Sequence, residues 1–125
     1  MPAPRLNLLL ASTALVVGCL LSPLALAHAH LKSQIPGAGA TVAAPAELRL
    51  SFSEGIEPSF SQVTLSAADG SNVEVKALNT ANGDNKTLVV TPAAPLHAGQ
   101  YKVQWQVLSV DTHKSNGTYS FTVGQ

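Results

Sequence analysis

Sulfur is almost missing from this chain of 125 residues, which has one cysteine, Cys19, and one methionine, Met1. Both precede residue 28, so the rest of the chain can form no disulfide, thiolate metal site or cysteine nucleophile. Charged residues are also few, at 11% of the chain, and seven basic side chains balance seven acidic ones. This balance argues against a basic surface of the kind that binds nucleic acids. Together with 46% hydrophobic residues, the low charge also argues against a disordered chain.

The one long hydrophobic run lies at the N-terminus and has the features of an export signal. Arg5 precedes a mostly apolar run over residues 6–21, and a proline and the pattern Ala25-Leu26-Ala27 follow it. A basic start, an apolar run and an A-x-A site are typical of a cleaved secretory signal peptide. We therefore predict a signal peptide over residues 1–27, export to the periplasm and no stable membrane insertion after cleavage.

The sequence leaves two other fates open for this N-terminal segment. An uncleaved run would act as a membrane anchor, although its length is at the short end for crossing a bilayer. The pattern Val16-Val17-Gly18-Cys19 resembles a weak lipobox, in which Cys19 would become a lipid-modified first residue. That cleavage would leave the apolar residues 20–27 at the mature end, so the ordinary signal peptide is the preferred interpretation.

After residue 30, apolar and polar residues alternate, which is typical of β-strands with one buried face. The clearest example is residues 101–107, YKVQWQV, and Gly, Pro, Asn and Asp residues separate such runs. Seven short strands are predicted, near residues 30–35, 48–52, 62–66, 73–75, 88–90, 101–107 and 119–123. Seven antiparallel strands in about 100 residues predict one all-β domain over residues 28–125, an immunoglobulin-like Greek-key sandwich or barrel.

Ionisable side chains follow the buried face of two of these predicted strands. Beyond residues 101–107, the inward-facing positions continue by period two through Ser109 to Asp111 and His113. Beyond residues 48–52, the next such position is Glu54. An unpaired charge is costly to bury, so these side chains should be exposed, paired or bound to a metal ion. Taken alone, an Asp-x-His pair is more often a hydrogen-bonded turn and a glutamate more often solvated, so a metal site depends on their combination.

A further ligand would arise from signal cleavage, which makes His28 the first residue and frees its α-amine. Amine and imidazole have ordinary pKa values of about 7.7–8.0 and 6.5, so both can be neutral donors near pH 7. They can close a chelate ring on one metal ion, to which His113 would add a nitrogen and Asp111 or Glu54 an oxygen. Nitrogen and oxygen ligands without sulfur favour Cu(II) or Ni(II), and copper has the higher affinity.

A competing arrangement uses the N-terminal tripeptide His28-Ala29-His30 alone. A free amine followed by histidine at position three can enclose square-planar Cu(II) with the amine, two deprotonated amides and the His30 imidazole. We prefer the folded site, because it needs no deprotonated amide and is preorganised. His30 would then lie beside the site or on the surface. His97 lies between Pro95 and Gly99 and is expected to be an ordinary surface-loop residue.

These motifs resemble those of a known family, the CopC-like periplasmic copper-binding proteins. The resemblance covers essentially all of residues 28–125 and is most specific at residues 109–123, SVDTHKSNGTYSFTV, and at the histidine beside the signal. It implies a Greek-key β-sandwich or barrel and a Cu(II) site. The implied ligands are the N-terminal histidine, the Asp and His of a D-x-H motif and, in some members, the glutamate after F-S. In this chain these positions are His28, Asp111, His113 and Glu54.

The expected function is therefore that of a Cu(II) carrier or buffer in copper resistance or import, which acts by chelation and not as an enzyme. The resemblance also implies an inner-membrane copper importer of the CopD type as a partner. Some family members carry a methionine-rich Cu(I) site, so the lack of methionine after Met1 predicts a Cu(II)-only protein.

Two other function classes compete with this expectation. The first is a copper-dependent oxidative enzyme, because an N-terminal histidine also binds copper in lytic polysaccharide monooxygenases. The small size argues against it, as does the aromatic pattern, which leaves only Phe60 free to stack on a sugar. The second is a metal-free immunoglobulin-like interaction module, which would bind no copper.

Overall fold

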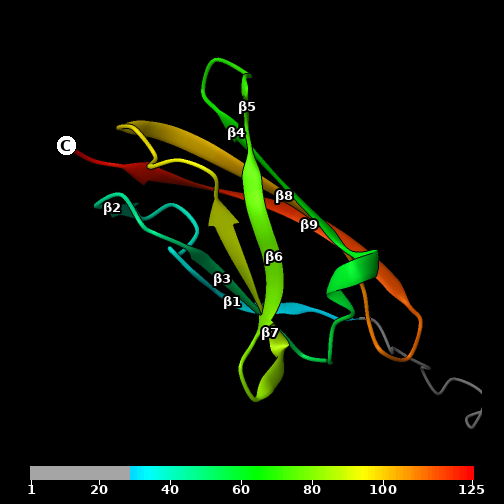
Figure 1. Cartoon of the computed structure of the whole chain (residues 1–125). Coiled ribbons are helices and arrows are strands. Elements are labelled where there is room, and N and C mark those ends of the chain that lie inside the picture. The colour runs from blue at the N-terminus through cyan, green and yellow to red at the C-terminus, as the bar shows by residue number, and fades with distance from the viewer. Residues whose placement is uncertain (1–28) are drawn as a thin grey trace, which may run out of the picture.

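Two β-sheets packed face to face make up the computed structural model of this protein (Figure 1). The structure describes residues 29–125, so the predicted signal peptide over residues 1–27 and the candidate ligand His28 lie outside the described part. The described strands are β1 (Leu31–Ile35), β2 (Thr41–Val42), β3 (Leu48–Phe52), β4 (Gln62–Ala67), β5 (Asn72–Val73), β6 (Val75–Ala81), β7 (Asp84–Pro92), β8 (Gly99–Leu108) and β9 (Lys114–Val123). A short 3-10 helix, η2 (Pro58–Phe60), precedes β4.

The order of the strands is that of an immunoglobulin-like Greek-key sandwich. One sheet has the order β1-β3-β7-β6 and the other β2-β9-β8-β4-β5. The first matches the A-B-E-D sheet of that fold, and β4, β8 and β9 match strands C, F and G. Strand β2 pairs in parallel with β9, and the other named strand pairs are antiparallel. The predicted fold class is therefore confirmed.

The strands differ in number and extent from those predicted. Two of the nine described strands, β2 and β5, are only two residues long, which leaves seven longer ones. The prediction of one strand at residues 73–75 was wrong in extent, since β5 ends at Val73 and β6 continues from Val75 to Ala81. Pairing of β6 with β7 shifts register twice, so period-two alternation is interrupted where the sequence would have shown it.

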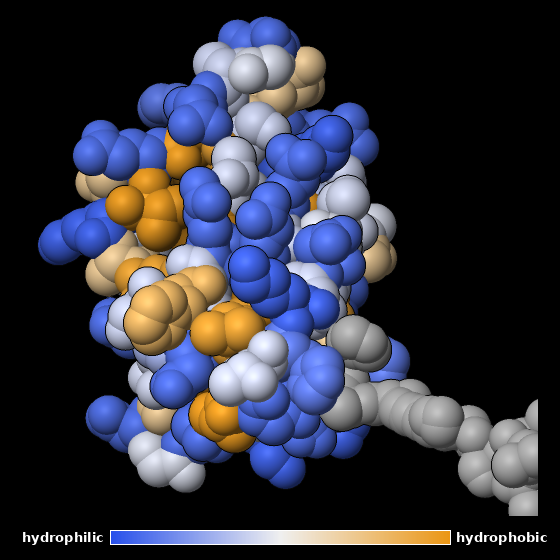
Figure 2. Space-filling model, turned by 90° about the vertical axis from the view of Figure 1, so that its right-hand side faces the viewer, coloured by the Kyte–Doolittle hydropathy of each residue, from blue (hydrophilic) through white to orange (hydrophobic). Residues whose placement is uncertain are grey.

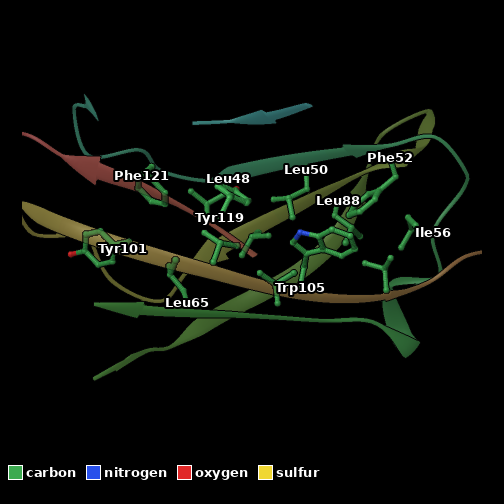
Figure 3. Close-up of a cluster of buried hydrophobic side chains, with 14 of the residues drawn as sticks. Leu48, Leu50, Phe52, Ile56, Leu65, Leu88, Tyr101, Trp105, Tyr119 and Phe121 are labelled. Carbon is green, nitrogen blue, oxygen red and sulfur yellow. The ribbon is translucent and has the colours of Figure 1, made fainter. Parts of the chain in front are cut away.

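The core lies between the sheets and is built from alternate residues of the facing strands (Figure 3). The even positions of β3 and the odd positions of β8 point inward, as the alternation predicts. Phe52 of one sheet meets Trp105 of the other edge to face, with ring centroids 5.1 Å apart. Tyr101 begins the buried run of β8, and its hydroxyl donates to the carbonyl of His97 at 2.7 Å, as in the tyrosine corner of sandwich domains.

One end of the sandwich collects segments that are far apart in the sequence. The start of β1, helix η2 and the turn between β8 and β9 lie together at the right of Figure 1. Within residues 29–125, no helix combines the length and the hydrophobicity needed to cross a membrane.

Candidate metal centre

Residues 109–113 form the turn that joins β8 to β9 and carry two of the candidate ligands. The N–H of Ser109 donates to the carbonyl of His113 at 2.9 Å, and the N–H of Thr112 donates to the carbonyl of Ser109 at 2.8 Å. Thr112 has φ 73°, in the left-handed region, which reverses the chain. Ser109 faces the core as predicted, but the predicted extended continuation to Asp111 and His113 is wrong because the chain turns after Ser109.

The side chains of Asp111 and His113 nevertheless meet. Oδ1 of Asp111 lies 3.3 Å from Nδ1 of His113, and the two side chains are 40% and 48% exposed. The hydroxyl of Ser109 donates to the same Oδ1. This hydrogen bond, together with the nearby imidazole, outweighs partial desolvation and holds the pKa of Asp111 below its usual value of 3.8. The pair thus presents an ionised carboxylate and an imidazole to solvent.

The start of the described chain is tied down beside this turn. Ala29 is buried, at 2% exposure, and its carbonyl accepts a hydrogen bond of 2.9 Å from Oγ of Ser115, near the start of β9. The N–H of His30 donates to Oγ of Ser53 at 2.9 Å, and the N–H of Ser53 donates back to the His30 carbonyl at 2.9 Å. His30 is an exposed residue, although its backbone is held by these two hydrogen bonds. Three hydrogen bonds therefore fix the segment that directly follows His28 in the sequence.

Glu54 belongs to the loop that follows β3 at this same end. It is partly buried, and the carbonyl of its neighbour Gly55 accepts a hydrogen bond of 2.9 Å from the N–H of Val110. Val110 belongs to the turn at residues 109–113, which we call the ligand turn because it carries the candidate ligands Asp111 and His113. A Cβ at Gly55 would lie 2.6 Å from the side-chain nitrogen of Asn85, so a larger residue there would have to displace the Asn85 side chain. Glu54 therefore lies between Ser53, which is hydrogen-bonded to His30, and Gly55, which is hydrogen-bonded to Val110.

The described residues alone do not complete a metal site. Within residues 29–125, no three His, Cys, Asp or Glu residues form a group that could hold a metal ion. The structure brings Asp111 and His113 into contact and places Glu54 on an adjoining loop, whereas the position of His28 lies outside the described residues. The face of the molecule shown in Figure 2 is mostly hydrophilic with scattered hydrophobic residues. The side chains of Asp111 and His113 are 40% and 48% exposed, so an ion can reach them from solvent.

The serines that organise this end of the sandwich were not among the predicted site residues. The alternation predicts Ser109 only as a core-facing position, although a hydroxyl at such a position signals a hydrogen-bonding role. Ser53 and Ser115 gave no such signal, because each acts on a segment distant in the sequence.

Comparison with known proteins identifies the family. The family model described as CopC domain matches residues 31–124. The chain belongs to the CopC family. It is 44% identical to copper resistance protein C of Pseudomonas syringae pv. tomato over 116 residues, which are 89% of this chain and 92% of that protein.

Solved structures of CopC-family proteins share the fold of this chain. PcoC, a methionine-rich copper resistance protein from Escherichia coli, is 40% identical with a TM-score of 0.70, covering 78% of this chain and 99% of PcoC. CopC from Methylosinus trichosporium OB3b is 32% identical with a TM-score of 0.72, covering 78% of this chain and 94% of that protein. The sandwich described above is therefore the CopC fold.

Proposed function

We propose that this protein is a periplasmic Cu(II) carrier or buffer, which binds the ion by chelation and serves copper resistance or import. Membership of the CopC family and relatives named copper resistance proteins support copper as the cargo and a binding protein rather than an enzyme. The observation that carries the proposal is the contact between Asp111 and His113, in a turn beside the anchored start of the described chain.

The proposed ligands are the amine and Nδ1 of His28, the imidazole of His113 and the carboxylate of Asp111, with Glu54 as a further oxygen donor. The Oδ1–Nδ1 separation of 3.3 Å is longer than a normal charge-assisted hydrogen bond of about 2.7–2.9 Å. Two donor atoms at that separation can, however, each lie about 2 Å from one shared ion. The geometry of the pair therefore suits two neighbouring ligands of a single metal ion.

The anchoring of residues 29 and 30 favours this folded site over the tripeptide arrangement. Binding by His28-Ala29-His30 needs the amide nitrogens of Ala29 and His30 in deprotonated form. The His30 N–H already donates to Ser53, and Ala29 is buried in the core. Capture by the tripeptide would break that hydrogen bond and pull Ala29 out of the core, which the folded site does not require.

The donor chemistry supports Cu(II) as the oxidation state of the cargo. Residues 28–125 contain no sulfur, whereas the relative PcoC is described as methionine-rich. Nitrogen and oxygen ligands favour Cu(II), and thioether sulfur would be needed to favour Cu(I). The proposal includes cleavage after Ala27, because His28 has a free amine only when it is the first residue of the mature protein. It also includes delivery of the ion to an inner-membrane copper importer of the CopD type.

The experiment is a Cu(II) titration of the mature protein, purified from the periplasm, with mass spectrometry to verify that His28 is the first residue. We expect one equivalent to bind with a tetragonal electron paramagnetic resonance (EPR) spectrum that is lost in His113→Ala and kept in the matched variant His30→Ala. A spectrum lost in His30→Ala but indifferent to His113→Ala would show that the tripeptide binds the metal. No binding at all would leave the metal-free interaction module.

A further inference from the structure

Ser109 occupies a position where the fold would ordinarily place an apolar side chain. It continues the buried stripe of β8 and is 0% exposed, and Thr87 is the only other buried polar residue within residues 29–125. Its backbone also forms an isolated β-bridge with Ile56. A hydroxyl at such a site must find a hydrogen-bond partner, because an unsatisfied buried polar group is costly. The identity of that partner indicates what the hydroxyl does.

Two acceptors surround the hydroxyl of Ser109, but it has only one proton to donate. One acceptor is Oδ1 of Asp111, and the other is the carbonyl of His113 at 3.2 Å. That carbonyl already receives the N–H of Ser109 at 2.9 Å. The proton is therefore better used on the charged carboxylate, since hydrogen bonds to charged acceptors are stronger. Ser109 thus holds Asp111 by its side chain and His113 by its main chain.

We propose that Ser109 is a positioning residue of the metal site, whose hydroxyl holds the Asp111 carboxylate in place for joint binding of an ion with His113. This inference rests on the proposed function and adds to it a residue that touches no metal. The carboxylate lies at 40% exposure, so without the hydroxyl it can rotate into water and must be reoriented when the ion binds. Loss of a group that orients a metal ligand typically lowers metal affinity about 10–100-fold.

The test compares Ser109→Ala with the matched variant Ser61→Ala. Ser61 also carries a hydroxyl at this end of β8, where it accepts the N–H of Leu108 at 3.1 Å and donates to the carbonyl of Glu57 at 2.8 Å. These two hydrogen bonds connect Ser61 to Glu57 and Leu108, outside the turn at residues 109–113. We expect Ser109→Ala to lower Cu(II) affinity about 10–100-fold and to alter the EPR hyperfine splitting. Ser61→Ala should leave both unchanged, while thermal unfolding of the metal-free proteins verifies that both variants fold.

A double-mutant cycle with Asp111→Asn identifies the route of the effect. If Ser109 acts through the carboxylate, Ser109→Ala should cost little further affinity once Asp111 is replaced. Fully additive effects, an equal loss in Ser61→Ala, or unchanged affinity in Ser109→Ala would each overturn the inference. The wild-type titration separates these outcomes from failure of the proposed function, because a wild-type protein that binds no Cu(II) would refute the copper site itself.

Discussion

Replacing Ser115 by alanine tests whether the anchored start of the chain belongs to the copper site. Its hydroxyl donates to the carbonyl of Ala29 at 2.9 Å, and Ala29 is the residue directly after His28. Without this bond, the buried carbonyl loses its partner and the segment can detach from β9. Leaving a buried acceptor without its hydrogen bond lowers the free energy of unfolding by about 1–3 kcal/mol.

The effect on copper binding follows from the cost of ordering the released segment again. Fixing the backbone of one residue costs about 1–2 kcal/mol, and about 1.4 kcal/mol corresponds to a tenfold change in affinity. Cu(II) affinity in Ser115→Ala should therefore fall about 5–30-fold. The ligands themselves are unchanged, so the EPR spectrum of the loaded protein should match that of the wild type.

The assay is a competitive titration against a Cu(II) chelator of known affinity at pH 7. Ser71→Ala is the control, because it removes a serine hydroxyl that donates to Asp69 at 2.6 Å in the exposed turn between β4 and β5. Affinity should be unchanged in the control. Unchanged affinity in Ser115→Ala, together with a measured loss of stability, would refute the reasoning, since the chain start would then contribute nothing to the site.

Three further predictions address the core, the acid response and the amine. Gly117→Ala should lower the free energy of unfolding by about 1–3 kcal/mol, measured by the fluorescence of Trp105 in denaturant, because a Cβ there would lie 2.5 Å from its indole ring. Hydrogen bonds from the Lys86 N–H and the Thr87 hydroxyl, both in β7, lower the pKa of Asp84 from 3.8, so its ionised form stabilises the fold above that pH. This gain disappears as the pH falls through the depressed pKa, and the stability difference between wild type and Asp84→Asn should therefore vanish in acid denaturation. One additional residue before His28 should remove the amine ligand and much of the Cu(II) affinity, whereas unchanged affinity in a titration would exclude the chelate ring.

The fold was predictable where a strand buries one face regularly. Strand β8 alternates exposed and buried residues from Gln100 to Val107, and β3 keeps its odd positions in contact with solvent, so period two identified both strands. The extent of strand β6 was not predicted, because two register shifts in its pairing with β7 interrupt the alternation between its two faces. The two-residue strands β2 and β5 were too short to give a pattern, and only tertiary pairing defines them.

The candidate site was predicted in part, and for a reason that the structure corrects. The sequence placed Asp111 and His113 side by side through an extended chain, yet a turn brings them together. The sequence gives no turn signal at Thr112, because a β-branched residue disfavours the positive φ that Thr112 adopts in the structure. The ligand role of His28 stays a prediction. The contacts of Ser53 and Ser115 could not be predicted, because they join segments 23 and 86 positions apart in the sequence.

The left-handed conformation of Thr112 indicates how the fold shapes the ligand turn. Register between β8 and β9 is continuous up to the pair Leu108 and Lys114, so residues 109–113 must reverse the chain within five positions. The N–H of Thr112 closes this reversal on Ser109, and the sandwich enforces a conformation that costs about 1–3 kcal/mol for a residue other than glycine. Strain of this kind persists only where the surroundings over-determine the backbone. The β8–β9 ladder, the Gly55 contact and the Ser109 bonds supply that constraint, and together they fix the backbone that carries Asp111 and His113, the two side chains proposed as metal ligands.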